Sequence, residues 1–158
     1  NFILWSVILL LIAPFAAYGA GQFLPYYDGF VVTSGSMEPE IMTGSILFTE
    51  PVDASKVSVG DTITYQSGDS FTTHKVIEKN SSAGSISFRT KGVANEDPDP
   101  NPVLEDQLAG KKLFSIPYIG YTVTWAGTDM GRVFLIALPA ILIIFMEIRT
   151  IAKEMRKD

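Results

Sequence analysis

Apolar residues are concentrated towards the two ends of the chain, and the middle alternates between apolar and polar positions. Residues 2–24 carry no charged side chain. About 20 predominantly apolar residues cross the hydrocarbon core of a bilayer, so this run predicts a transmembrane helix. Small residues near its end also fit a cleavable signal peptide. We favour a retained anchor because the run exceeds the apolar core of about 7–15 residues found in signal peptides.

A second apolar segment lies near the C-terminus, where residues 133–146 carry no charge. Extended to residues 131–148, it predicts a second transmembrane helix, although its uncharged part is short and also fits a buried core helix. Residues 149–158 form a basic tail, which favours a cytoplasmic C-terminus. Two spans then put both termini in the cytoplasm. We therefore expect a multi-pass protein of the cell membrane with residues 25–130 as an extracytoplasmic domain.

Short alternating segments in residues 25–130 predict a mainly β domain. Expected strands cover residues 29–33, 45–49, 62–66, 71–78, 85–91 and a part of 104–114 near its end. Turns are expected over residues 79–84 and 117–120. Residues 92–102 contain three prolines within five positions, which excludes helix and strand there. The fold class is therefore a β domain between two transmembrane helices.

The composition limits which partners, metal ligands and catalytic groups the chain can have. Residues 22–131 hold 14 Asp and Glu against 7 Lys and Arg, a difference of −7, which argues against nucleic acid as a partner. The chain has no cysteine, so it has no disulfides and no cysteine ligands or nucleophile. Its single histidine, His74, excludes a multi-histidine metal site. We expect no metal and no cofactor, and any imidazole catalysis must use His74.

The stretch Ser34-Gly35-Ser36-Met37-Glu38-Pro39 is the candidate for nucleophilic chemistry. Gly35 permits a bend that can expose a hydroxyl and align nearby backbone N–H groups, as a serine nucleophile with an oxyanion site requires. The same residues also suit an ordinary polar loop.

Ser36, His74 and an aspartate of the 92–102 loop could converge as a Ser-His-Asp set. A lone histidine on a strand is otherwise a half-exposed residue without a special role. The loop carboxylates also fit a solvated turn or a weak cation site.

Taken together, these segments resemble type I signal peptidase, in the branch found in archaea, the endoplasmic reticulum and some spore-forming bacteria. The resemblance covers about residues 30–122, and no single segment would suffice for it. The matching segments are residues 34–39, 44–47, 59–63, 73–76, 90–92 with Asn95 and Asp99, and 117–120.

The resemblance implies a role for each matching residue. Ser36 would be the nucleophile, His74 the general base and Asp99 the third member. Asp97 is the rival for that third place, or a supporting carboxylate. The family usually has an acid directly after the Lys-Gly pair, where this chain has Val93, so one supporting carboxylate is missing.

Two further residues have roles implied by the resemblance. The hydroxyl of Ser34 would assist the oxyanion site beside the backbone N–H of Ser36, or it is a turn-capping serine. Met37 would line the substrate cleft or pack beneath it. A Ser-Lys pair is the poorer alternative, because strand alternation turns Lys75 away from the face of His74. Lys91 as the base is a further, weaker alternative.

The resemblance implies a membrane-bound serine endopeptidase that removes signal peptides from exported preproteins. Its partners would be signal peptides and the lipid bilayer, and accessory subunits remain open. One alternative is a self-cleaving repressor-type Ser-Lys protease, against which the apolar ends and the histidine argue. The other is a catalytically inactive, membrane-anchored β-domain that acts in an envelope or secretion complex.

Overall fold

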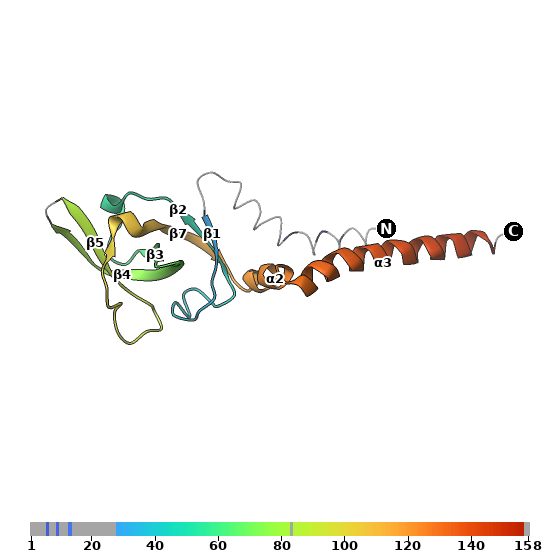
Figure 1. Cartoon of the computed structure of the whole chain (residues 1–158), viewed down its shortest axis with the longest axis horizontal. Helices are drawn as coiled ribbons and strands as arrows, with labels where there is room; N and C mark the ends of the chain where they lie inside the picture. Colours follow the sequence, from blue (N-terminus) through green and yellow to red (C-terminus); the bar gives the residue numbers. More distant parts are fainter. Residues whose placement is uncertain (1–5, 7–8, 10–12, 14–27, 83, 157–158) are drawn as a thin grey trace.

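A computed structural model describes residues 28–82 and 84–156 of the chain, together with Ser6, Leu9 and Ala13. The N-terminal transmembrane helix predicted over residues 2–24 lies almost entirely outside the described residues. In Figure 1 the described part consists of a β-sheet body, from which a long helix extends at one end.

The body is built on seven antiparallel strands, so the mainly β prediction is confirmed. Their order in the sheet is β1-β2-β7-β3-β4-β5-β6. The strands are β1 (Asp28–Val31), β2 (Ile46–Glu50), β3 (Thr62–Ser67), β4 (Ser70–Ser82), β5 (Ser85–Lys91), β6 (Val103–Leu104) and β7 (Leu108–Ile116). Two 3₁₀ turns, η1 (Ala54–Lys56) and η2 (Glu105–Gln107), and two helices, α2 (Ile119–Ala126) and α3 (Asp129–Glu154), complete the described part.

The predicted strands overlap β1 to β5 and β7, whereas the short strand β6, the end of β4 and helix α2 differ from the prediction. The polar run Lys79 to Ser82 continues β4 in place of a turn, because its residues pair with β5 from Phe88 to Ser85. Helix α2 begins at Ile119, so it replaces the second half of the turn predicted over residues 117–120, and the sequence pattern had not predicted a helix there. The 92–102 loop contains neither helix nor strand, as its prolines predict.

Alternating strand residues fill two neighbouring cores. The larger one packs six buried side chains, which are Val57, Ile63, Tyr65, Val76, Phe88 and Val103. The smaller one joins Met37 and Ile41 of the Ser36 loop to Leu47 of β2, with Val32 against them. Because Met37 follows Ser36 directly, burial of its side chain anchors the candidate nucleophile to the sheet.

The sheet curls so that strands far apart in its order approach each other. Phe30 of β1 and Phe71 of β4 contact with ring centroids 5.0 Å apart, although three strands separate β1 from β4 in the sheet. A groove lined by residues of both strands and by Ser36 lies between them.

Helix α2 packs beneath the loop that carries Ser36. The N–H of Gly120 donates to the carbonyl of Gly44 at 2.8 Å, and the N–H of Gly44 donates to the carbonyl of Val32 at 2.8 Å. Gly44 has a φ of +78°, and a Cβ there would lie 2.1 Å from the ring of Tyr121. Glycine is therefore required at this position for both its backbone angle and its close contact.

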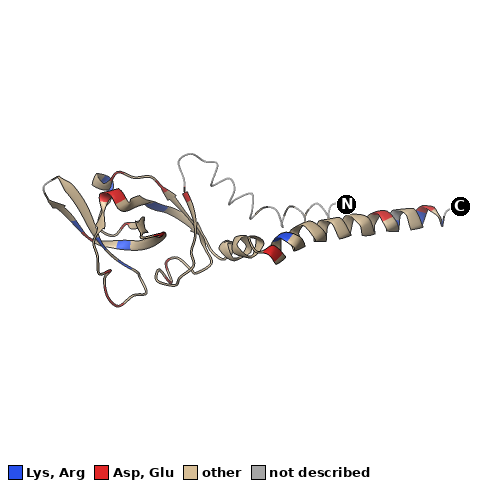
Figure 2. Ribbon diagram, in the orientation of Figure 1, with Lys and Arg blue, Asp and Glu red and all other residues tan. Residues whose placement is uncertain are grey.

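Helix α3 is the one helix among the described residues that is long and apolar enough to cross a membrane. It runs from Asp129 to Glu154, so it extends further than the span predicted over residues 131–148 and includes part of the basic tail. Thr128 caps its start by accepting from the N–H of Gly131 at 3.0 Å. In Figure 2 the charged residues of α3, coloured blue and red on the ribbon, lie towards its two ends and not in its middle.

We predict that Gly44→Ala destabilises the β domain more than Gly60→Ala does. Both glycines have positive φ, but nothing lies within 4 Å of a Cβ at Gly60. The control should therefore cost only backbone strain, about 1 kcal/mol or more, which lowers Tm by roughly 4–8 °C per kcal/mol in a domain of this size. Thermal unfolding of the full chain in detergent measures the difference.

A double variant tests the contact itself. The double variant Tyr121→Ala with Gly44→Ala should lose less free energy of unfolding than the two single variants lose together, because the methyl group added at position 44 then has room. Equal losses of Tm for Gly44→Ala and Gly60→Ala would contradict the close contact.

Candidate active site

The candidate nucleophile Ser36 lies in a loop closed by its own hydrogen bonds. The N–H of Glu38 donates to the carbonyl of Gly35 at 3.0 Å, and the N–H of Ile41 donates to the carbonyl of Met37 at 2.9 Å. The Glu38 carboxylate accepts from the hydroxyl of Thr43 at 2.7 Å and from its N–H at 3.1 Å. These bonds to Thr43 hold the pKa of Glu38 below its ordinary value. The loop is therefore a fixed turn.

His74 connects Ser36 to Asp99 through its two ring nitrogens. It lies on β4 opposite Ile63 and is 6% exposed. Its Nδ1 lies 2.6 Å from Oδ2 of Asp99, and its Nε2 lies 3.1 Å from Oγ of Ser36. An ionised carboxylate only accepts hydrogen bonds, so Nδ1 carries the hydrogen in the neutral ring. Nε2 is then the acceptor for the Ser36 hydroxyl.

Asp99 is held by donors from three strands. Besides His74 of β4, its Oδ2 accepts from the hydroxyl of Thr90 on β5 at 2.6 Å and from the phenol of Tyr65 on β3 at 3.0 Å. Its N–H donates to the carbonyl of Thr90 at 2.8 Å. Burial alone would raise the pKa of Asp99, but these hydrogen bonds and the neighbouring imidazole outweigh it and lower the pKa. The carboxylate is therefore ionised at neutral pH.

Tyr65 and Thr90 are the members of this network that the sequence did not assign. Burial, together with the adjacent carboxylate, raises the pKa of Tyr65 to about 12, so its phenol stays protonated and donates. Thr90 is fully buried. Strand alternation was the available signal, because Tyr65 lies across β3 and β4 from Thr72, two residues before His74. Thr90 already stood in one of the matching segments, without a role.

The acidic loop is fastened to the Ser36 turn through its backbone. The N–H of Ala94 donates to the carbonyl of Ser36 at 2.8 Å, and the Lys91 ammonium donates to the carbonyl of Glu96 at 2.8 Å. A Cβ on Gly92 would lie 2.7 Å from the Ser36 carbonyl oxygen, so only glycine allows this approach. The glycine of the Lys-Gly pair thus brings the loop against the nucleophile turn.

The structure separates Asp99 from its rival Asp97. Asp97 is exposed, and no hydrogen bond or ion pair to its side chain occurs among the described residues. Lys75 points away from Ser36, as strand alternation predicts, and its ammonium contacts the Glu40 carboxylate at 2.5 Å. Lys91 is engaged by the acidic loop.

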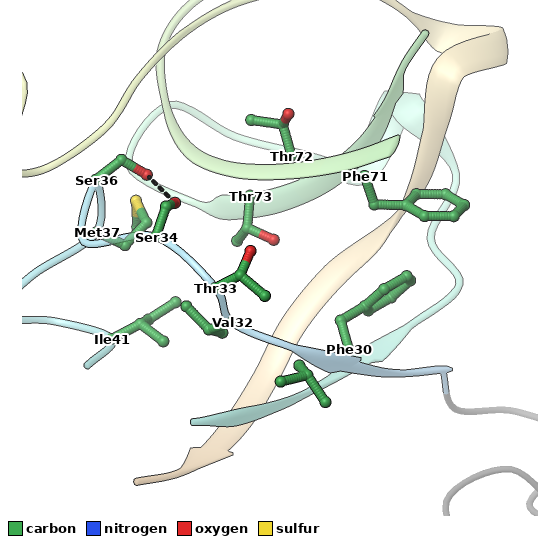
Figure 3. A pocket seen from close by; sticks show the side chains of 11 residues that line it. Phe30, Val32, Thr33, Ser34, Ser36, Met37, Ile41, Phe71, Thr72 and Thr73 are labelled. Carbon is green, nitrogen blue, oxygen red and sulfur yellow. Dashed lines mark hydrogen bonds between the residues drawn. The ribbon is translucent and has the colours of Figure 1, made fainter. Parts of the chain in front are cut away.

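Ser34 and Met37 both border a groove beside Ser36. The hydroxyls of Ser34 and Ser36 lie 3.5 Å apart, marked by a dashed line in Figure 3. Met37 is 2% exposed and is one of the residues that line the groove.

The groove itself has a volume of about 290 Å³. Its walls come from residues 30–34 on one side and 71–73 of β4 on the other, and Phe30 and Phe71 meet at the end away from Ser36 (Figure 3). From Ser70 to His74, β4 pairs with β3 on one edge, and β5 begins to pair only at Lys75. One edge of β4 is therefore open along the groove.

The backbone N–H of Ser36 is available to a ligand. Within the described part of the chain it donates to no acceptor. A backbone donor next to a nucleophilic hydroxyl is one component of an oxyanion site. By contrast, the described residues contain no group of three or more His, Cys, Asp or Glu that could hold a metal ion.

No protein-family model matches the chain. The chain is similar to Signal peptidase I W of Bacillus subtilis, with 38% identity over 79 residues. The match covers 49% of this chain and 42% of that protein, so the chain spans less than half the length of this curated relative. The similarity supports the signal peptidase I resemblance, and it does not distinguish the branch.

We predict that Thr90→Val destabilises the protein in a pH-dependent way. A carboxyl group whose pKa is lower in the folded than in the unfolded protein adds to the free energy of unfolding at pH values above its unfolded pKa, which is about 3.9. This contribution is lost as the pH falls through the folded pKa. The substitution removes a donor to Asp99, which raises its pKa. The free energy of unfolding of the wild type should exceed that of Thr90→Val by roughly 1–3 kcal/mol at pH 7, and this difference should shrink below about pH 4.

Thr64→Val is the matched control, because Thr64 is equally buried but its hydroxyl bonds only the Thr73 hydroxyl, at 2.7 Å. The loss in free energy of unfolding caused by Thr64→Val should not change with pH. Unfolding of the full chain in detergent from pH 3 to pH 7 measures both. A gap between wild type and Thr90→Val that is constant with pH would contradict an ionised, hydrogen-bonded Asp99.

Proposed function

We propose that the chain is a membrane-bound serine endopeptidase that cleaves signal peptides from exported preproteins. Ser36 is the nucleophile, His74 the general base and Asp99 the residue that orients the imidazole. The observation that carries the proposal is the continuous line of hydrogen bonds from Ser36 Oγ through His74 to Asp99 Oδ2, at 3.1 and 2.6 Å. Similarity to Signal peptidase I W supports the choice of substrate.

The proposed reaction proceeds through an acyl-enzyme. Ser36 Oγ attacks the carbonyl carbon of the scissile bond while His74 Nε2 takes the hydroxyl proton. The bond from carbon to nitrogen then breaks, and the imidazolium gives that proton to the leaving amine. Water, deprotonated by the same nitrogen, releases the acyl group from Ser36. Asp99 stabilises the imidazolium in both steps and keeps its own charge.

Stabilisation of the tetrahedral oxyanion is proposed to come from the Ser36 turn. The N–H of Ser36 has no acceptor within the described residues, and the Ser34 hydroxyl lies 3.5 Å from the Ser36 hydroxyl. In a site shielded from water, each such donor contributes about 10²–10³-fold to the rate. Ser34 is therefore proposed as the second donor of this site.

The groove suits an extended peptide. Its walls are strand backbones, and the open edge of β4 can add a substrate strand by main-chain hydrogen bonds. Main-chain pairing recognises a peptide without demanding a particular sequence, and the side-chain pockets then select among peptides. This combination fits signal peptides, whose cleavage sites follow an A-x-A-like pattern of small residues.

The proposed arrangement in the membrane follows the apolar segments. Residues 2–24 and 131–148 cross the bilayer, residues 25–130 form the extracytoplasmic peptidase domain, and residues 149–158 lie in the cytoplasm. Helix α3 supports the second span by its length and composition. The branch of archaea and the endoplasmic reticulum is proposed because His74, and not a lysine, contacts Ser36.

We predict that Ser36→Ala abolishes cleavage of a model preprotein by the full chain in detergent, with a fall of roughly 10⁴-fold or more. Ser34→Ala should lower the cleavage rate by about 10²–10³-fold, because it removes one proposed oxyanion donor. Ser58→Ala, an exposed serine outside the site, is the control at equal folded protein. Unchanged cleavage by Ser36→Ala would remove the nucleophile from the proposal. A wild type that cleaves nothing would favour the inactive β-domain.

A second pair of variants assigns the aspartate. Asp99→Asn should reduce cleavage by about 10²–10⁴-fold, because an amide cannot hold the imidazole in the required tautomer. Asp97→Asn should change cleavage by less than about twofold, since exposed carboxylates without partners contribute little. Initial rates of preprotein cleavage measure both. A larger loss for Asp97→Asn would reverse the assignment.

A further inference from the structure

A second cavity, of about 440 Å³, lies beside the pair formed by His74 and Asp99. Its walls include Thr72 and His74 of β4, Asp99 and Asn101 of the acidic loop, and Ser67 at the end of β3. The groove beside Ser36 does not include His74 or Asp99, and the second cavity does not include Ser36. The two spaces therefore have different linings at the site, one including Ser36 and the other His74 and Asp99.

The two spaces are nevertheless connected through the site. Thr72 lines both of them, and the 3.1 Å contact between Ser36 Oγ and His74 Nε2 joins a wall of the groove to a wall of the cavity. A peptide cleaved here must place its carbonyl carbon at Ser36 and its leaving nitrogen within reach of His74 Nε2. Upstream residues then occupy the groove, and the chain continues past the imidazole.

We propose that this second cavity binds the first residues downstream of the cleaved bond, which become the N-terminus of the released protein. This inference rests on the proposed function and adds the recognition of the leaving side of the substrate. The groove selects the residues that are removed, and the cavity selects among the residues that are kept.

The lining indicates small or polar residues as the preferred occupants. The Asn101 amide and the hydroxyls of Ser67 and Thr72 have no hydrogen-bond partner within the described residues, so they are free to contact a peptide. Asp99 is the charged member of the lining, and no lysine or arginine of the described chain contributes to it. A newly formed α-amino group, with a pKa of about 8, therefore meets no like charge there.

The test compares two substrates with the same upstream residues. One is a peptide that continues for four residues after the cleavage site, and the other ends as a methyl ester whose leaving group is methanol. Asn101→Trp and Ser67→Trp narrow the cavity from opposite walls, and both positions are exposed, which limits damage to the fold. Glu105→Trp is the control, because Glu105 is exposed and does not line the cavity.

Either cavity variant should lower kcat/KM for the long peptide by about 10-fold or more, equivalent to about 1.4 kcal/mol, and for the ester by less than about twofold. Glu105→Trp should change neither. Equal loss on both substrates, or no loss on the peptide by both cavity variants at equal folded protein, would overturn the inference. If the wild type cleaved neither substrate, the result would instead contradict the proposed function, and this inference with it.

Wild-type protein gives an independent readout. In a series of peptides with Gly, Ser or Trp at the first two downstream positions, kcat/KM should fall from the small residues to Trp. In the Asn101→Trp variant the difference in kcat/KM between the peptides with small residues and those with Trp should be larger, because the cavity has less room. An order that is flat in the wild type would overturn the inference without any variant.

Discussion

One carboxylate oxygen, Oδ2 of Asp99, determines how the site is assembled. It accepts from His74, Thr90 and Tyr65, which lie on β4, β5 and β3. Even a partly buried negative charge is costly without donors, so the three neighbouring strands must keep the register that directs these donors to one point. That register also sets the direction of the His74 ring. Since Nδ1 is hydrogen-bonded to Asp99, Nε2 remains for Ser36, and the geometry required by the proposed acid-base chemistry follows from satisfying one charge.

The nucleophile turn is a separate unit that is attached to this network from two sides. On one side the N–H of Ala94 bonds the Ser36 carbonyl, which the missing side chain of Gly92 permits. On the other side Glu40, four residues after Ser36, forms an ion pair with Lys75, the residue after His74. Alternation places His74 and Lys75 on opposite faces of β4, so the turn is held to both faces of the strand that carries His74. The backbone contact and the ion pair together fix the 3.1 Å approach of hydroxyl to imidazole.

Local pattern predicted most of the strands, because alternation, glycines and prolines act within a few residues of sequence. It also indicated Ser36 and His74 as candidates, whereas the choice of Asp99 within the 92–102 loop came from the family resemblance. The contributions of Tyr65 and Thr90 were missed, since a buried hydroxyl becomes part of a site only through long-range register. Helix α2 was missed for a related reason. Its eight residues carry no charge pattern that marks a helix, and its position depends on contacts of Gly120 and Tyr121 with Gly44. Asp97 and Asp99 differ by two positions in one loop, and only the fold distinguishes the exposed carboxylate of Asp97 from the partly buried, hydrogen-bonded carboxylate of Asp99.

Helix α2 also links the site to the candidate membrane span at short range. It packs beneath the Ser36 loop at Gly44, and Gly127 and Thr128 alone separate it from α3. The junction is tight, because the Thr128 hydroxyl donates to the Trp125 carbonyl at 2.6 Å and Trp125 contacts Phe134 edge-on. With α3 in a bilayer, no flexible linker would lie between the membrane and the groove. The height of Ser36 above the lipid would then be set by the eight residues of α2. Tyr121 and Trp125 of this helix, and Tyr118 directly before it, are exposed and suit the interfacial region. A substrate held by its own apolar segment would meet the nucleophile at that fixed height, so geometry would help select the bond to be cleaved.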